Sequence, residues 1–346
     1  MDLLIYETDF SLLAIVDTAS SVIWANRFRQ CGDFEVYIPA SAALLELLTL
    51  DRFVGRTDDE MLGIIEHVEI QTDEESGDFM IVTGRCARSI LDRRIVWEQT
   101  IFSGTVENGL RKLVTDAFIS PTITARKYAA LRLADAHGYT ERARMQDTGT
   151  ILLEAIEERC AAYNYGFKIT LEDDELVLDF YKGNDRSADQ DTLPRLIFSE
   201  DFDNLTASQY VRDKTGYKTV ALIAGEGEGT ARKKTTVSRS TDVSGLARRE
   251  MYIDARDLST NEGEVGDDEY TEMLAERGTS ELQSAAVVES MEGTVEAGQM
   301  HKYKVDYFLG DTVTVINKYG ITANSRVLEV VEVWDENGYT CTPTFG

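Results

Sequence analysis

The chain has 346 residues, of which 35 are Lys or Arg and 62 are Asp or Glu, so its formal net charge is −27. A surface this acidic repels phosphate backbones and anionic lipids, which argues against specific nucleic-acid recognition and against membrane adhesion. Apolar residues make up 43 % of the chain, a share typical of a globular protein, and the length suits two or three domains.

The cysteines and the apolar runs narrow the class of protein further. Cys31, Cys86, Cys160 and Cys341 are far apart and form no CxxC pair, which favours buried free thiols over disulfides or a zinc site. The N-terminus has no basic region ahead of an apolar run, and no stretch approaches about 18 apolar residues. We therefore expect a chain without a signal peptide or membrane insertion that is made in the cytoplasm.

The first 98 residues predict a small β-barrel. Residues 34–38 alternate apolar with polar side chains, as a half-buried strand does. Residues 64–71 and 79–83 predict two more strands, which an acidic turn at 73–77 separates. A short helix near residues 42–50 is expected to close the barrel.

Residues 99–216 predict a small α/β unit. Thr105 is a suitable N-cap for a helix whose apolar face runs through residues 106–118. A second helix is expected at 152–163, where apolar residues recur at helical spacing. Residues 167–171 and 176–180 then alternate on either side of four acidic residues, which predicts a hairpin.

Residues 217–346 predict a second β-barrel with a polar helix inserted around 267–285. Its strands are expected at 217–224, 250–255, 302–308, 311–317 and 326–334. The whole chain is therefore expected to be mainly β with α+β insertions, in three domains that span residues 1–98, 99–216 and 217–346.

Two of the predicted strands look like copies of one another. Residues 64–70 align without gaps with residues 327–333, with Glu, Val and Glu in common and aliphatic exchanges at three further positions. An acidic turn that contains glycine follows each run. Alternating strands also resemble one another by chance, so coincidence stays as the alternative. A true repeat would give one chain two related barrels, and three chains in a ring would present six.

Two segments have compositions that suggest ligand binding. Gly225–Gly229 places two glutamates between its glycines, and these would repel a phosphate, so a hairpin or a flexible loop is the favoured interpretation. Residues 232–249 form a basic island, which can be read as a solvated loop or as a surface that pairs with an acidic face of a neighbouring copy. DNA contact is the third and weakest interpretation, because the segment lacks an aromatic platform.

Acidic residues and histidines form no motif of an enzyme or a metal centre. The acidic clusters lie at 58–60, 173–175 and 267–269, and none has the spacing of a calcium loop. His67, which we expect to be half-buried, His137 and His301 do not match a zinc-peptidase pattern, and GxSxG is absent. We therefore predict no catalytic, cofactor-binding or metal-ligating residues and no cofactor.

A series of motifs runs along nearly the whole chain. They are residues 32–35, 83–85, 90–94, 185–187, 198–199 with 203–205, 225–229, 249–250 with 252–256, 306–313 and 343–346. In their order and spacing they resemble the tail-hub family of long-tailed phages, and in particular the Pepy-type siphovirus tail proteins. The resemblance implies two tail-tube-like β-barrels with intervening α/β domains, assembled as a homotrimer at the distal end of the tail.

The function that this resemblance implies is structural. Such a protein is a baseplate-hub or tail-tip component of the virion, which joins the sixfold tail to a threefold tip and lines the channel through which DNA leaves. The implied partners are further copies of the chain, the distal tail protein ring, the tape-measure protein and tail-tip or receptor-binding proteins, while phage DNA passes without specific binding. The net charge suggests that an acidic channel wall repels the DNA and lets it slide.

Two other functions are compatible with the same resemblance. Many relatives continue into a peptidase or lysin domain, whereas this chain stops at Gly346, so we expect no enzymatic activity. The first alternative is a tail-associated lysin subunit that lacks its catalytic extension. The second is a receptor- or carbohydrate-binding tail module.

Overall fold

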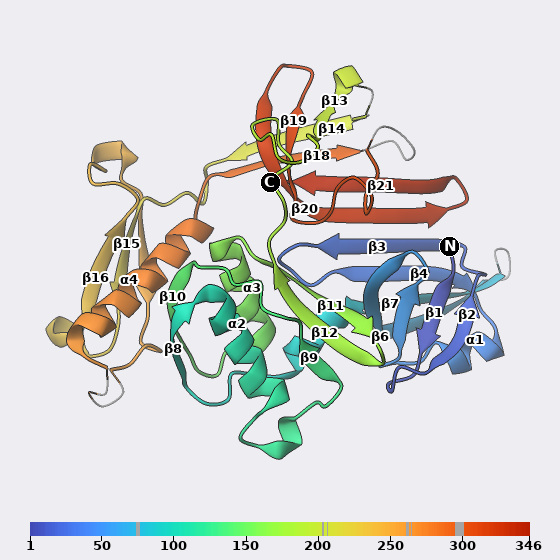
Figure 1. The fold of residues 1–346 in the computed structure, drawn as a ribbon, viewed down its shortest axis with the longest axis horizontal. Coiled ribbons are helices and arrows are strands. Elements are labelled where there is room, and N and C mark those ends of the chain that lie inside the picture. The colour runs from blue at the N-terminus through green and yellow to red at the C-terminus, as the bar shows by residue number, and fades with distance from the viewer. Residues whose placement is uncertain (74–76, 203, 206, 261–262, 264, 295–300) are drawn as a thin grey trace.

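The protein, seen in a computed structural model, is mainly β with a few helices (Figure 1). All residues are described except 74–76, 203, 206, 261–262, 264 and 295–300. Most strands belong to one large sheet, to which an N-terminal half, a middle part and a C-terminal half all contribute. The predicted fold class, mainly β with helical insertions, is confirmed.

The N-terminal half of the sheet buries the apolar faces that sequence alternation predicts. Phe34, Val36 and Ile38 lie in a core that also holds Trp24, whereas Glu35 is exposed. The elements are β1 (Leu3–Tyr6), β2 (Leu12–Val16), β3 (Ser21–Arg27), β4 (Asp33–Pro39), α1 (Ala42–Leu47), β5 (Phe53–Arg56), β6 (Asp59–Asp73), β7 (Gly77–Cys86) and the 3₁₀ helix η1 (Ala87–Arg93). The strands pair in the order β2–β1–β5–β6–β7–β4–β3.

The middle part contains the two predicted helices and the predicted hairpin. Its elements are β8 (Thr100–Thr105), α2 (Val106–Val114), η2 (Thr115–Ile119), η3 (Thr124–Arg126), β9 (Leu131–Leu133), β10 (Arg142–Asp147), α3 (Leu152–Tyr163), β11 (Gly166–Glu172) and β12 (Glu175–Tyr181). The Thr105 side chain accepts a hydrogen bond from the Asn108 N–H and so caps α2, as predicted. Asp173 and Asp174 form the hairpin turn, both with positive φ, a conformation that Asp tolerates better than most residues.

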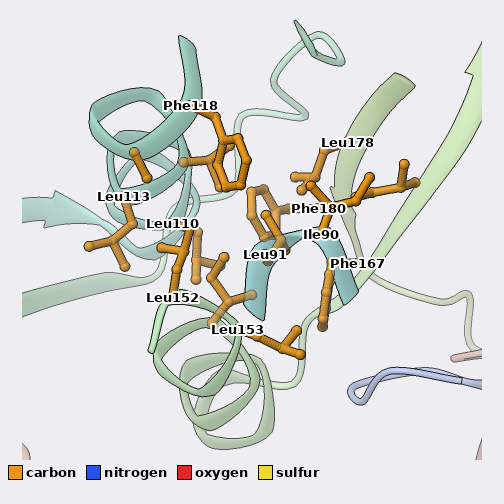
Figure 2. Close-up of a cluster of buried hydrophobic side chains, with 14 of the residues drawn as sticks. Ile90, Leu91, Leu110, Leu113, Phe118, Leu152, Leu153, Phe167, Leu178 and Phe180 are labelled. Carbon is orange, nitrogen blue, oxygen red and sulfur yellow. The ribbon is translucent and has the colours of Figure 1, made fainter. Parts of the chain in front are cut away.

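A large apolar core fixes the middle part onto the N-terminal half. Figure 2 shows Ile90 and Leu91 of η1 surrounded by side chains from both helices and from the hairpin. The surrounding residues are Leu110, Leu113, Phe118, Leu152, Leu153, Phe167, Leu178 and Phe180. Because η1 follows directly on β7, this core leaves little freedom between the middle part and the N-terminal sheet.

The C-terminal half of the sheet collects strands from two distant segments of the chain. They are β13 (Ile197–Ser199), followed by the 3₁₀ turn η4 (Glu200–Phe202), and β14 (Ala207–Asp213), β18 (Val288–Thr294), β19 (Thr312–Ile316), β20 (Thr322–Asp335) and β21 (Gly338–Phe345). They pair in the order β13–β19–β20–β21–β18–β14 around a core that contains Phe198, Tyr307 and Val313.

A separate unit projects from one side of the molecule (Figure 1). It consists of β15 (Val220–Ala224), η5 (Gly229–Ala231), β16 (Lys234–Ser238), η6 (Gly245–Ala247), β17 (Glu250–Asp254) and α4 (Asp267–Ser284), which covers the three strands. The predicted helix at 267–285 is thus confirmed. The strands predicted at 217–224 and 250–255 also exist, but they pair within this unit and not with the C-terminal half.

One predicted strand is wrong, and two features of the predicted architecture stay predictions. Residues 302–308 form a turn and not a strand: the Lys302 N–H donates to the Asp306 carboxylate at 2.7 Å, and Lys304 has a φ of 65°. Within the described residues no strand pairing closes either half into a barrel, so the barrels and the domain boundaries stay predictions. The predicted turn at 73–77 and the motif at 203–205 both include positions outside the described residues.

Candidate assembly interface

The two halves of the sheet repeat the same arrangement of four strands. In the N-terminal half the order is β3–β4–β7–β6, and in the C-terminal half it is β14–β18–β21–β20. Each series ends in a long antiparallel hairpin, β6 with β7 and β20 with β21. The two runs that look alike in sequence therefore occupy the same place in two similar sheets.

Each hairpin contains a β-bulge, and the positions of the two bulges show which residues of the two runs correspond. In the first hairpin Ile65 lies opposite Gly84 and His67 opposite Thr83, so Glu66 is the extra residue. In the second hairpin Val327 lies opposite Phe345 and Glu329 opposite Thr344, so Leu328 is the extra residue. Ile65 therefore corresponds to Val327, and the gapless alignment, which pairs residue 64 with residue 327, is one residue out of register.

The two halves are joined edge to edge by β20 and β3. These strands pair antiparallel, from Glu329 opposite Arg27 to Trp334 opposite Val22. The Arg27 guanidinium binds the Glu329 carboxylate at 2.6 Å, and the Phe28 N–H donates to the Leu328 carbonyl at 2.7 Å. We name this contact the β20–β3 junction.

A buried cluster of charged side chains, which we name the junction cluster, lies beside this contact. Glu332, whose side chain is 3 % exposed, forms ion pairs with Arg56 at 3.1 Å and with Lys304 at 2.9 Å. Arg56 also binds Asp58 at 2.9 Å, and Lys304 binds Asp59 at 3.0 Å. The cluster thus ties the N-terminal half, the turn at 302–308 and the C-terminal half together.

Aromatic rings shield the junction cluster and favour its charged form. The Arg56 guanidinium carbon lies 4.1 Å from the Trp334 ring centroid and 5.3 Å from that of Trp24. Burial alone would lower the pKa of Arg56, but the carboxylates of Asp58, Glu332 and Asp59 outweigh it and raise the pKa. Burial likewise would raise the pKa of Asp58, yet its hydrogen bonds and attraction to Arg56 lower it. Such a fully paired network positions strands and offers no free base or nucleophile.

Each of the two four-strand arrangements has one strand edge that lacks a ladder partner among the described residues. The first is β6 beyond Ile65, on the side away from β7; up to Ile65 this side is bonded to residues 51 and 52. The second is β14, on the side away from β18. The β6 edge displays Ile70, which is 47 % exposed. Open edges of this kind are places where strands of another chain can add.

A cleft of about 630 Å³ lies next to the junction cluster. Both lysines and carboxylates line its wall, among them Lys182 and Asp311. Lys182 binds Glu141 at 2.5 Å, and Asp311 binds Arg186 at 2.9 Å. These charges are satisfied by partners in the same chain, so the geometry supports a structural rather than a catalytic role for the cleft wall.

The cysteines reveal one proximity that the sequence did not indicate. All four are free thiols; Cys86, Cys160 and Cys341 are buried, and Cys31 is partly buried. The sulfur atoms of Cys31 and Cys86 lie 3.3 Å apart because β4 and β7 are neighbours. Burial would raise the pKa of Cys86, but the hydrogen bonds from Cys31 and Arg88 and the charge of Arg88 lower it well below its usual value.

The two segments whose compositions suggested ligand binding are bonded within the projecting unit. Gly225–Gly229 belongs to the β15–β16 hairpin, as predicted, and the Gly225 N–H donates to the Lys233 carbonyl. Most cations of the basic island bind groups in the same region of the chain. They are Arg232 with Asp254, Lys233 with Asp267, Arg239 with the Lys218 carbonyl, Arg248 with Glu250 and Arg249 with the Lys214 carbonyl. This bonding disfavours a role for the island in pairing copies or in holding DNA.

The structure also places the histidines and acidic residues that had been considered as metal or enzyme sites. His67 is 61 % exposed, so the expectation that it is half-buried is wrong. His137 binds Asp179 at 2.9 Å and stacks on Tyr139. Within the part of the chain that the structure describes, no group of three or more His, Cys, Asp or Glu side chains is arranged to hold a metal ion. None of the described helices is long and apolar enough to cross a membrane.

Residues 2–346, almost the whole chain, match the family model described as Siphovirus ReqiPepy6 Gp37-like protein. The chain belongs to this siphovirus tail protein family. The resemblance to Pepy-type siphovirus tail proteins is thereby confirmed for this Gp37-like family member. No curated protein sequence matches the chain.

Solved structures of phage tail proteins share the fold of this Gp37-like chain. The 43 kDa tail protein of prophage MuSo2 from Shewanella oneidensis has a TM-score of 0.61 at 13 % identity, over 100 % of this chain and 98 % of that one. A tail protein from Neisseria meningitidis MC58 has a TM-score of 0.59 at 15 % identity, over 99 % and 95 %. Prophage tail protein gp18 from Listeria monocytogenes EGD-e has a TM-score of 0.54 at 13 % identity, over 99 % and 94 %. The family and these three structures are tail proteins rather than enzymes.

Proposed function

We propose that the chain is a structural baseplate-hub or tail-tip protein, three copies of which form a ring at the distal end of a siphovirus tail. The observation that carries the proposal is the repeated four-strand arrangement in the two halves of the sheet. A ring of three chains contains six such arrangements, so its symmetry is threefold while its contact surface is close to sixfold. This is the geometry that an adaptor between a sixfold tail and a threefold tip requires.

The ring's partners follow from this position in the virion. On its sixfold side the ring would contact the distal tail protein ring and the tape-measure protein, and on its threefold side tail-tip or receptor-binding proteins. Phage DNA would pass through the central channel without specific binding. Three copies carry a formal charge of 3 × (−27), or −81. We propose that part of this charge lines the channel, where it repels the DNA backbone and prevents the many weak attractions that would slow ejection.

The proposed role is structural and not enzymatic. The charged side chains of the junction cluster and of Lys182 and Asp311 in the cleft wall are paired within the chain, which supports this view. A zymogram on host cell walls is expected to show no clearing by the purified chain, and clearing would favour the lysin alternative.

Two measurements test the hub proposal. Light scattering on the purified chain is expected to give about three times the monomer mass of 38.7 kDa. Cryo-electron microscopy of tail tips is expected to show one threefold ring of this chain below the sixfold tube, with acidic side chains around the channel. A sixfold ring of this chain, or its absence from the tip, would contradict the hub role. A channel lined by basic or neutral residues would contradict only the acidic wall.

A further inference from the structure

We propose that the open edges of the two four-strand arrangements pair with each other between neighbouring copies, so that residues 67–72 of β6 bind residues 208–213 of β14 in the next copy. This pairing rests on the ring assembly proposed above and specifies the contact that builds it. The β20–β3 junction inside each chain supplies the template, because β20 corresponds to β6 and β3 corresponds to β14. The pairing that β20 and β3 form within each chain would thus be repeated by β6 and β14 at every subunit boundary.

The bulges set the register on the β6 side. Ile65 and Val327 correspond because each comes immediately before the extra residue of its hairpin. Their partners across the hairpins, Gly84 and Phe345, therefore correspond as well. Counting five residues along each strand, Ile70 corresponds to Glu332. In the junction Glu332 lies opposite Trp24 of β3.

The strand pairs set the register on the β14 side. Phe34 lies opposite Gly84, and Met291 opposite Phe345, so Phe34 and Met291 correspond. Trp24 in turn lies opposite Phe34, and Tyr210 lies opposite Met291. Tyr210 therefore corresponds to Trp24, and the template places Ile70 of one copy opposite Tyr210 of the next.

The side chains that meet in this register are compatible. Ile70 is exposed in the isolated chain, and Tyr210 already packs against the C-terminal core, so pairing would cover an apolar side chain with an apolar ring. His67 would lie opposite Asp213, at the position where the Arg27–Glu329 ion pair closes the junction. The Glu66 carbonyl would accept a hydrogen bond from the Lys214 N–H of the next copy, just as the Leu328 carbonyl accepts one from the Phe28 N–H in the junction.

The two edges are different surfaces, so their pairing is head to tail. Such a contact continues from copy to copy until the rotation closes a ring, in which every β6 edge and every β14 edge is covered. Pairing of β6 with a second β6 would instead stop at a dimer. The geometry of the edges thus favours a ring over a two-copy assembly.

A disulfide trap tests the register. In the junction the Phe28–Leu328 pair is hydrogen-bonded, and antiparallel pairs alternate, so Val331 and Ala25 form a non-hydrogen-bonded pair. Their counterparts are Glu69 and Val211, whose Cβ atoms would come close enough for a disulfide across the boundary. The test variant carries Glu69→Cys and Val211→Cys in the full chain.

The matched control carries Glu69→Cys and Arg212→Cys, which would place the two thiols on opposite faces of the sheet. After mild oxidation, a non-reducing gel of the test variant is expected to show covalent dimer and trimer that reductant abolishes. The control variant, the two single variants and the unsubstituted chain are expected to stay monomeric on the same gel. A mixture of the two single variants is expected to stop at the covalent dimer.

Light scattering on the same samples separates this pairing from the hub function. Trimers that form without the cross-link would overturn the edge pairing and leave the hub in place. Equal cross-linking in the test and control variants would overturn the register. Covalent dimer from Glu69→Cys alone would overturn the head-to-tail order. Monomers throughout would overturn the pairing together with the trimeric ring on which it rests.

Discussion

Glu332 binds two cations, Arg56 and Lys304, and also accepts a hydrogen bond from the Tyr339 hydroxyl at 2.9 Å. In the repeat it occupies the position of Ile70, so an acidic residue in one half replaces an apolar residue in the other. Nothing in the sequence distinguishes Glu332 from other acidic residues on alternating strands. Its role depends on Arg56 and Lys304, which are far away along the chain and come close only in the fold.

Removal of Glu332 should destabilise the protein strongly. Glu332→Ala leaves Arg56 buried with fewer carboxylates, and loss of one partner of a buried ion pair costs about 3–5 kcal/mol. Glu329→Ala removes the part-exposed partner of Arg27 and should cost about 0–1 kcal/mol. Urea unfolding followed by tryptophan fluorescence gives both values, since Trp24 and Trp334 flank Arg56. Equal losses in the two variants would show that the junction cluster is not a key contact.

Acid should weaken the junction cluster through Asp58. Burial would raise the pKa of Asp58, but Arg56 lowers it below the value of the unfolded chain. A carboxyl with a lowered pKa stabilises the fold fully above its unfolded pKa of about 4, and the stabilisation is lost as the pH falls through the folded value. The stability difference between the unsubstituted chain and Asp58→Asn should therefore be present at neutral pH and shrink below about pH 4. Urea unfolding across this pH range measures it; a difference that grows in acid would contradict the assignment.

Among the elements, the β6–β7 hairpin depends on a glycine at the bulge. A Cβ atom on Gly84 would lie 1.8 Å from the carbonyl oxygen of Ile64, so the backbone would have to move. We expect Gly84→Ala to cost about 1–3 kcal/mol or more, because strands in a packed sheet resist such shifts. Gly216→Ala meets no atom within 4 Å and should stay within about 0.5 kcal/mol. Thermal unfolding midpoints compare the two, and a neutral Gly84→Ala would show that the hairpin can shift freely.

Local patterns predicted most elements because short-range physics decides them. The alternation through Phe34, Val36 and Ile38 marked β4, and Thr105 marked the start of α2. Residues 302–308 alternate just as well but form a turn, in which Val305 is 69 % exposed. The reason is again non-local, since the turn carries Lys304 to Glu332.

The repeat shows a second limit of sequence patterns. Glu66 and Glu329 coincide in the gapless alignment and suggested a register, but Glu66 is the extra residue of a bulge and Glu329 is a paired residue. A bulge shifts every following side chain by one position, and no residue type common to both hairpins marks it, since Gly84 lies at the first bulge and Phe345 at the second. The pairing of β20 with β3, and hence the candidate interface, could not be predicted either. The two strands are about 302 positions apart in the chain, and local patterns do not show which distant strands become neighbours.

At the scale of the whole molecule, net charge should govern how readily copies associate. Each copy carries a formal charge of −27, so copies repel one another at low ionic strength. We expect the proposed trimer to tighten as salt rises from about 20 mM to about 300 mM, because ions screen this repulsion. Sedimentation equilibrium at several salt concentrations measures the dissociation constant. Weaker association at high salt would instead indicate that ion pairs dominate the interface.

The β20–β3 junction also sets the time at which the sheet can be completed. Arg27 leaves the ribosome 302 positions ahead of its partner Glu329. At translation rates of about 5–20 residues per second, β3 waits about 15–60 s for its neighbour. While the residues between them are made, the nascent chain therefore exposes the edge of β3 that β20 covers in the folded protein. A chain that is cut short would keep this site open and be prone to aggregate rather than to enter a tail.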